Sequence, residues 1–444
     1  MAHAPTHSSI RSWRLALWLG ALLLLIATPI DASATAAPDL RKDMKRAIRS
    51  GDETLAQATM SKLAEEGSPE SIEAITWAMR EFVSRSLFDH GVEVLTDVGS
   101  EKLGAFFEPL FEERKPDAET LGIAMVLAET LKDDRSESWI TTGLRHELDL
   151  VVRLAMHAAV ERRSKAAIPV LIDLIDPDLT EGRGAITHFA RASLVALVGQ
   201  DFQSIEDWRN FWKASGATFD PEASDEDEPT KVHRDVEAPE FFGVPIISSN
   251  VAFVIDISGS MQRFDPGGES GRSSWEVRQR ITRTKRALAE AINKLSKDSK
   301  FNVIAFNEEI TRFQKRLVPA SKGAKNKSMR WVKKLVADRG TDTGAALKAA
   351  FEDPRVDTIV LLSDGSPHTP EGEPRELMPK VLRLIKDLNR IRRVPIHTFG
   401  FTGEGEWPPG SKYRGQPIRA NPQQLEAFLR EIAKSTGGEF TKID

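Results

Sequence analysis

Residues 250–261 form the stretch NVAFVIDISGSM, which decides the fold of the second half of the chain. The stretch begins with an unbroken apolar run, Val251 to Ile255, and then turns abruptly into Asp256, Ser258 and Ser260. A short apolar run closed by a Gly/Ser/Asp turn is typical of a strand that is buried on both faces of a sheet. Because open α/β sheets bind their ligands beyond the carboxyl ends of strands, we expect this turn to carry a binding site.

The three polar residues of the turn indicate what kind of ligand it binds. Asp256, Ser258 and Ser260 alternate along the chain, so a tight turn can direct one carboxylate and two hydroxyls at a single point. Oxygen ligands of this kind favour a hard divalent cation, Mg²⁺ first, with Ca²⁺ or Mn²⁺ as alternatives, over zinc or copper.

Two later stretches extend this pattern. Residues 340–344, GTDTG, form a loop before the short helical run 345–351, and the apolar run 358–362 ends in Ser363-Asp364-Gly365. Together with residues 256–260, these stretches resemble the metal-ion-dependent adhesion site of von Willebrand factor A domains.

The resemblance implies a set of ligands and a mode of action. It places the metal on Asp256, Ser258, Ser260, Thr341 and Asp364, with Thr343 as the alternative to Thr341. It further implies that an Asp or Glu of a partner protein fills a free coordination position. The expected function is therefore that of an exported protein-binding or adhesion module, and not that of an enzyme.

Two other interpretations stay open at this stage. Aspartate and serine also cap helices, so Asp256 and Asp364 could serve only local structure. The protein could also be a structural envelope scaffold that binds through its helical half, with an inactive metal site. Against capping alone, two carboxylates at the mouth of one sheet would resist ionisation unless a cation lay between them.

The remainder of the second half alternates strands and helices, which predicts a doubly wound, mostly parallel α/β sheet over residues 245–444. Strands are expected at 301–306, 358–362 and 395–401, with a last short strand at 439–443. A Lys-rich helix is expected to turn Trp331, Leu335 and Val336 inward.

Composition limits the remaining possibilities. A chain of 444 residues is expected to hold two or three domains, and its net charge of −5 gives no reason to propose a nucleic-acid partner. The absence of cysteine excludes disulfides and thiol chemistry. His146-Glu147 is followed by Leu150 where a zinc protease needs a second histidine, and neither a nucleophile elbow nor a phosphate loop occurs.

Residues 1–36 are expected to be an export signal. Arg11 and Arg14 precede an apolar stretch, Leu15 to Ile26, and small residues follow it. This stretch is short for a membrane span, which needs about 20 residues. The mature chain is thus expected in the periplasm, in the cell envelope or outside the cell, with membrane contact only if the segment stays uncleaved as an anchor.

Between the signal and the α/β half, the sequence predicts helices. Apolar residues recur at three- and four-residue spacing over residues 37–215, and the helices expected at 166–175 and 186–198 resemble HEAT-type repeats, with an irregular helical bundle as the alternative. The aromatic residues of 202–212 are expected to close the array. Residues 216–244 contain Asp225-Glu226-Asp227-Glu228 among prolines and predict a solvated acidic linker.

Overall fold

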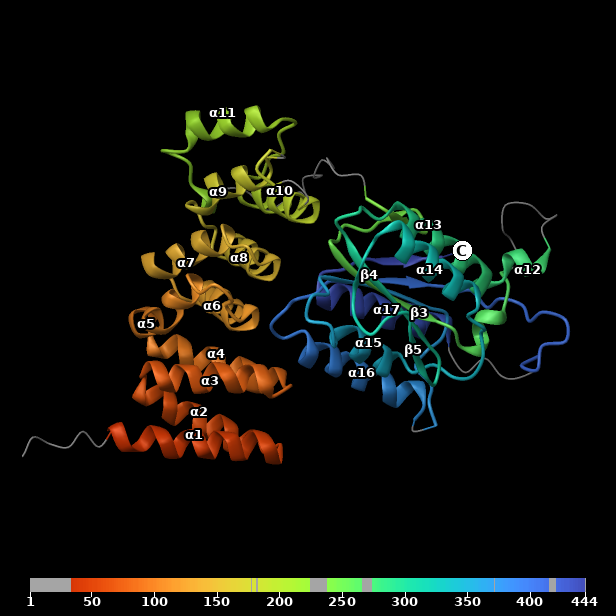
Figure 1. The fold of residues 1–444 in the computed structure, drawn as a ribbon, viewed down its shortest axis with the longest axis horizontal. Helices are drawn as coiled ribbons and strands as arrows, with labels where there is room; N and C mark the ends of the chain where they lie inside the picture. Colours follow the sequence, from red (N-terminus) through yellow and green to blue (C-terminus); the bar gives the residue numbers. More distant parts are fainter. Residues whose placement is uncertain are drawn as a thin grey trace, which may run out of the picture.

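The computed structural model describes residues 33–176, 178–180, 183–223, 238–265, 274–370, 372–414 and 421–443. An all-helical region forms one side of the molecule, and a sheet covered by helices forms the other (Figure 1). Residues 1–32 of the expected export signal and residues 224–237 of the expected linker lie outside the described residues, so both stay predictions.

The helical region is a two-layer stack. Its helices are α1 (Ser33–Ser50), α2 (Glu53–Glu66), α3 (Pro69–Glu81), α4 (Arg85–Val98), α5 (Ser100–Phe111), α6 (Ala118–Thr130), α7 (Asp134–Leu144), α8 (Asp149–Glu161), α9 (Ala167–Leu174), α10 (Gly184–Val198) and α11 (Ile205–Ser215). Odd-numbered helices pack on odd-numbered ones and even-numbered helices on even-numbered ones, while sequence neighbours pair across the layers. This is the predicted stack of helix pairs, in which each pair buries its apolar faces against the next.

The stack ends in the expected aromatic cluster. Trp208 on α11 is fully buried, and its ring centroid lies 4.8 Å from that of Phe202. The ring centroid of Phe211 lies 5.1 Å from that of Phe202. These rings cover the apolar end of α9 and α10, which no further helix pair covers among the described residues.

The second region is built on a mostly parallel sheet with the strand order β5-β4-β3-β7-β8-β9. Strands β3 (Asn250–Asp256), β4 (Lys300–Phe306), β7 (Thr358–Ser363), β8 (Ile396–Gly400) and β9 (Phe440–Lys442) are parallel, whereas β5 (Ile310–Arg312) and β6 (Val318–Pro319) pair antiparallel with β4. A separate hairpin joins β1 (Glu240–Phe241) to β2 (Val244–Pro245). The predicted α/β architecture is confirmed.

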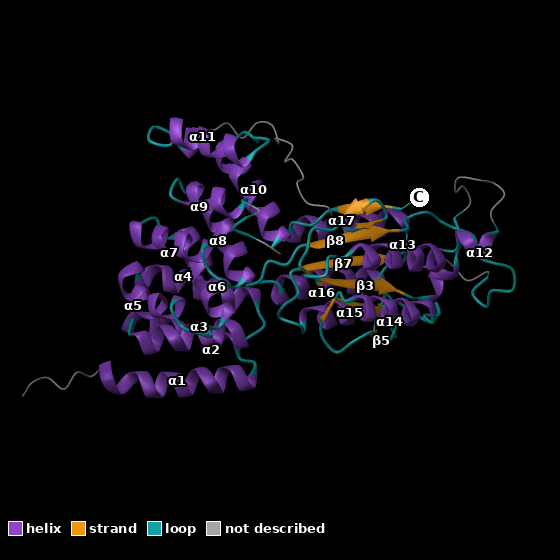
Figure 2. Cartoon of the chain, turned by 45° about the horizontal axis from the view of Figure 1, so that its top comes forward, coloured by secondary structure: helices purple, strands orange, loops and turns teal. Residues whose placement is uncertain are grey.

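Helices cover both faces of this sheet (Figure 2). Val251, Phe253 and Ile255 of β3 pack on the face covered by α13 (Arg280–Lys294) and α14 (Lys322–Lys333). Ala252 and Val254 pack on the face covered by α15 (Thr343–Phe351), α16 (Pro374–Leu388) and α17 (Pro422–Thr436). The apolar run of β3 is therefore continuous because both of its faces are buried. Three short helices complete the described elements: η1 (Pro221–Ala223), η2 (Gly259–Gln262), whose Met261 is buried in the core on the α13 face, and α12 (Trp275–Arg278).

One predicted core position is wrong. Val336 is 73% exposed, although Trp331 and Leu335 pack on the core as expected. Helix α14 ends at Lys333, so the helical spacing that would turn Val336 inward does not reach it. Val332, one position before the end of the helix, is buried instead.

Candidate metal centre

The sheet brings the two predicted carboxylates to the same edge. Strands β3 and β7 are parallel neighbours, and Ile255 pairs with Leu362 at the end of their register. The residues that follow, Asp256 on one strand and Asp364 just after the other, therefore emerge side by side. Both are buried.

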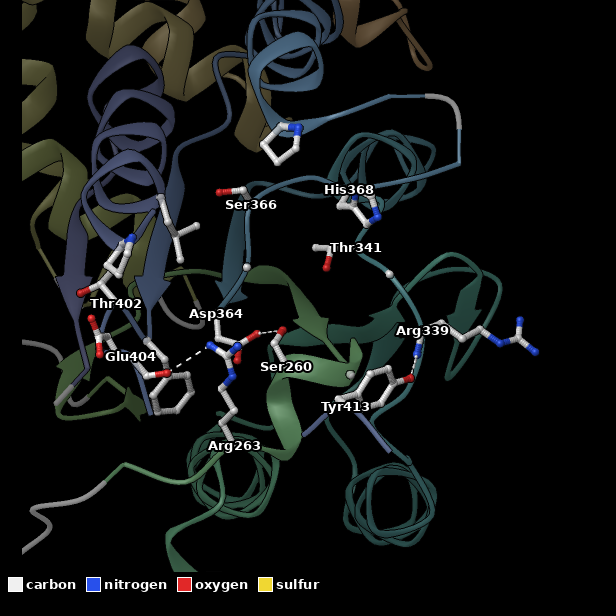
Figure 3. A pocket seen from close by; sticks show the side chains of 18 of the residues that line it. Ser260, Arg263, Arg339, Thr341, Asp364, Ser366, His368, Thr402, Glu404 and Tyr413 are labelled. Atoms are coloured by element: carbon white, nitrogen blue, oxygen red, sulfur yellow. Dashed lines mark hydrogen bonds between the residues drawn. The ribbon is translucent and has the colours of Figure 1, made fainter. Parts of the chain in front are cut away.

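Hydrogen bonds connect the polar residues of this edge. The carboxylate of Asp256 accepts one bond from the backbone N–H of Ser258 at 2.7 Å and another from the hydroxyl of Ser363 at 2.6 Å. The hydroxyls of Ser258 and Ser260 lie 3.0 Å apart, and that of Ser260 donates to Oδ1 of Asp364 at 2.6 Å (Figure 3). Four of the five predicted ligands thus form one connected cluster.

The fifth predicted ligand, Thr341, comes from the loop before α15. Its backbone N–H and carbonyl exchange two hydrogen bonds with His368, both 2.8 Å long, which fix this loop beside the one that follows β7. Thr341, Ser260 and Asp364 line the same cavity of about 290 Å³. A Cβ on Gly365 would lie 3.4 Å from Oγ1 of Thr341 and 3.5 Å from Oγ of Ser260, so the glycine leaves room between the two hydroxyls.

Thr343, the alternative ligand, lies in a different environment. It is the first residue of α15 and is 1% exposed, and its hydroxyl has no hydrogen-bond partner among the described residues. The cavity is lined by Thr341. This placement favours Thr341 over Thr343 as a ligand.

Charge at the site is unevenly compensated. Burial, and then repulsion from Asp364, raise the pKa of Asp256 to about 7, although the bonds from Ser258 and Ser363 act in the opposite direction. Asp364 instead lies 2.9 Å from the guanidinium of Arg280, and neither side chain of that pair is exposed. In the described structure, the contacts of the Asp256 carboxylate come from hydroxyl and amide groups, so a cation would relieve the cost of its burial.

Sequence inspection missed two members of this site. Ser363 directly precedes Asp364 at the end of β7, so its polar character at the end of an apolar run could have indicated it. Arg280 lies 84 residues before Asp364, at the start of α13, and nothing in the local sequence connects the two.

The donors of the cluster fit a hard cation. They are carboxylate and hydroxyl oxygens only, which suits Mg²⁺, Ca²⁺ or Mn²⁺ and does not suit zinc or copper. No group of three or more His, Asp or Glu side chains that could hold a metal is found within the described ranges. The hydroxyls of Ser258, Ser260 and Thr341 are therefore needed to complete a ligand set here.

An aromatic wall borders the cavity. The rings of Trp407 and Tyr413 stack at 5.6 Å, and the guanidinium of Arg263 lies 4.5 Å from the Trp407 ring centroid. A Cβ on Gly259 would lie 2.7 Å from Cζ of Tyr413, so a larger residue at this position would require the tyrosine ring to shift. The hydroxyl of Tyr413 accepts from the backbone N–H of Arg339 at 2.9 Å. The site is thus an open cavity with polar depths and an aromatic side.

Comparison with known proteins agrees with this architecture. Residues 270–409 match the von Willebrand factor type A domain family. The human inter-alpha-trypsin inhibitor heavy chain H4 is 33% identical over 218 residues, which are 46% of this chain and 19% of that protein. The human von Willebrand factor A domain-containing protein 3B is 28% identical over 142 residues, 32% of this chain and 9% of that protein. This chain therefore spans about a fifth or less of the length of these relatives.

Similar solved structures also match less than half of the chain. A von Willebrand factor type A protein from Catenulispora acidiphila is 22% identical, with a TM-score of 0.32, and the match covers 44% of this chain and 39% of that one. The BatB protein from Bacteroides thetaiotaomicron is 18% identical, with a TM-score of 0.32, and covers 44% of this chain and 90% of that one.

The strand order, the paired carboxyl ends of β3 and β7 and the match over residues 270–409 lead to one conclusion. The α/β half of this chain is a von Willebrand factor type A domain, and it is preceded by an all-helical region.

Proposed function

We propose that this protein is a binding module that holds a divalent cation, Mg²⁺ first, and uses it to capture an acidic side chain of a partner protein. The observation that carries the proposal is the buried cluster at the ends of β3 and β7. There a fully buried carboxylate, that of Asp256, lies among hydroxyls and next to a second carboxylate. Such a cluster is costly unless a cation shares it.

The residues of this site would have distinct roles in holding the cation and admitting the partner. Asp256, Ser258, Ser260, Thr341 and Asp364 would hold the cation, and the hydroxyl–carboxylate bonds among them fix their positions beforehand. A bound cation would supply an open coordination position for a carboxylate oxygen of the partner. The cavity lined by Ser260, Thr341 and Asp364 is where that oxygen would enter.

We further infer that this binding takes place outside the inner membrane, because of the export signal expected at residues 1–36. No helix among the described residues is both long and apolar enough to span a membrane. The partner itself is proposed only by its chemistry, as a protein that presents an Asp or Glu.

Calorimetric titration of Mg²⁺ into the full chain tests the metal site. We expect saturable binding by the native protein and none by Asp256→Ala, because this substitution removes the only carboxylate of the turn. Asp298→Ala is the matched control, since Asp298 is exposed in the loop before β4, at the opposite edge of the sheet. No heat from the native protein would favour the structural scaffold, whose metal site is inactive.

A pair of isosteric variants sharpens the same titration. Thr341→Val removes a hydroxyl that lines the cavity and is expected to weaken Mg²⁺ binding about tenfold or more, a loss of ~1.4 kcal/mol. Thr343→Val removes a buried hydroxyl without a described partner, so it should leave the affinity unchanged. The reverse ranking would assign the ligand to Thr343.

Capture of a partner is the second half of the proposal. Pull-down from an envelope extract with the immobilised native chain should retain a protein in Mg²⁺ and release it in chelator. The Asp256→Ala variant should retain none of it. Retention by this variant in the presence of chelator would contradict metal-dependent capture.

A further inference from the structure

A fully buried arginine contacts the proposed metal site. Arg280 is 0% exposed, and its Nη1 donates to Oδ2 of Asp364 at 2.9 Å. The other oxygen of the same carboxylate, Oδ1, accepts from Ser260. Asp364 therefore has one oxygen directed to the hydroxyl cluster and the other to a positive charge.

Arg280 is held in place from several segments. Its Nη2 donates to Oδ1 of Asp265 at 2.8 Å and to the carbonyl of Gly403 at 2.7 Å, and its backbone N–H donates to the carbonyl of Arg263. Its guanidinium also lies 5.6 Å from the ring centroid of Phe401. Burying an arginine is costly unless it is paired and hydrogen-bonded, so this arrangement is a specific feature of the site.

The two carboxylates of the site consequently differ. Asp364 has a guanidinium beside it, whereas the contacts of Asp256 in the described structure are a hydroxyl and a backbone N–H. Arg280 also pairs with Asp265, which Arg283 contacts as well. With all carboxylates ionised, Asp256, Asp364 and Asp265 together with Arg280 and Arg283 carry a single negative charge. A dication bound there would then leave a net positive charge, whereas without Arg280 it would leave none.

We infer that Arg280 is a positioning residue, an inference that rests on the proposed function. Its pairing with Asp364 leaves more of the positive charge of a bound cation available to the carboxylate of the partner. By compensating Asp364, it weakens the hold of the protein on the cation and strengthens the attraction of the site for an incoming carboxylate. Arg263 lines the same cavity and adds charge of the same sign. The positive electrostatic potential at the site favours an anionic carboxylate as the ligand, because a neutral oxygen ligand gains far less from the remaining positive charge.

The inference predicts two effects of opposite sign in one variant. Arg280→Gln should bind Mg²⁺ about tenfold more tightly than the native chain, because a nearby positive charge has been removed. The same variant should lose the response to a carboxylate. Acetate, used as the probe against chloride at equal ionic strength, should raise the apparent Mg²⁺ affinity of the native chain by occupying the open position, and should not do so in the variant.

Arg283 offers a matched control on the same helix. It also contacts Asp265, at 3.0 Å, and its guanidinium lies 5.0 Å from the ring centroid of the same Phe401. The contact with Asp364 belongs to Arg280. Arg283→Gln should therefore change the Mg²⁺ affinity and the acetate response much less than Arg280→Gln does.

A charge-preserving variant separates compensation from simple support. Arg280→Lys keeps the charge but loses most of the hydrogen bonds, so it should resemble the native chain in both titrations. If Arg280→Gln does not fold, a lost acetate response in Arg280→Lys still contradicts compensation by charge. Two outcomes would overturn this inference and leave the proposed function intact. One is an Arg280→Lys variant that differs from the native chain in both Mg²⁺ affinity and acetate response, and the other is a folded Arg280→Gln variant that is unchanged in both. Absence of Mg²⁺ binding by the native chain would overturn it together with the proposed function.

Discussion

Asp256 illustrates at the scale of one residue how a binding site is maintained at the expense of stability. Its carboxyl is fully buried, and its pKa is raised to about 7 by burial and by Asp364. In the unfolded chain the same group would titrate near its ordinary value of 3.8. Without a metal, the folded state therefore binds a proton that the unfolded state has already released between these two pH values.

This difference predicts the pH dependence of the metal-free protein. The contribution of Asp256 to stability is fully present below about pH 4 and is lost as the pH rises toward 7. In chelator, Asp256→Asn should therefore gain stability over the native chain as the pH rises from 4 to 8, by an amount on the order of a few kcal/mol. Urea unfolding of both proteins across this range measures the difference. A difference that stays constant with pH would contradict the raised pKa.

The residues of the candidate site that could be predicted from the sequence are those that belong to a local motif. Asp256, Ser258 and Ser260 follow one apolar run, and Asp364 follows another, so the parallel pairing of two buried strands is enough to bring them together. Arg280 could not be found in this way, because its role depends on where α13 begins relative to β7. A contact of this kind is a property of the tertiary structure.

At the scale of the element, strand β3 shows why some core positions could be predicted and others could not. Its apolar run is uninterrupted because helices cover both faces, so each residue from Val251 to Ile255 is buried whichever way it points. The burial predicted for Val336 had no such structural basis. Its predicted burial depended on where α14 ends, and the boundaries of elements are the least predictable feature of a sequence.

A pair of valine substitutions tests this difference. Val254→Ala on β3 should destabilise the α/β domain by about 2 kcal/mol or more, because it removes two buried carbons and leaves a cavity. Val336→Ala should change stability by less than about 0.5 kcal/mol, since this side chain is 73% exposed. Urea unfolding of both variants provides the measurement. Equal losses of stability in the two variants would indicate that Val336 is buried in the core.

At the scale of the whole molecule, the sequence predicted two regions but gave no indication of how they meet. The loop between α16 and β8 docks on the helical stack (Figure 1). This loop lies where the parallel strands begin, whereas the metal cavity lies where they end. Arg390 donates to the carbonyl of Met79 at 3.1 Å, and Arg393 forms a two-bond ion pair with Glu129 at 2.6 and 2.8 Å. Between them, Ile391 is 3% exposed and belongs to the core of the helical region.

Gly122 on α6 makes this insertion possible. A Cβ at Gly122 would lie 3.3 Å from Cγ2 of Ile391 and 2.9 Å from Cδ1 of Leu154, so the glycine provides the recess that the isoleucine occupies. Arg153 on α8 adds hydrogen bonds to the carbonyls of Asp357 and Arg392 at 3.0 and 2.9 Å. The contact combines an apolar anchor with hydrogen-bonded arginines around it, which is the composition of a specific interface.

Ile391→Asp should consequently separate the two regions without unfolding either one. A carboxylate in this recess would be buried without a partner, and moving it into water requires the loop to leave the stack. Small-angle X-ray scattering should show a larger radius of gyration for this variant than for the native chain. Val336→Asp, at an exposed apolar position, is the control and should leave the radius unchanged. Because the metal cavity lies at the other end of the sheet, the separated variant should keep the native Mg²⁺ affinity, and a lost affinity would show that the docked stack supports the site.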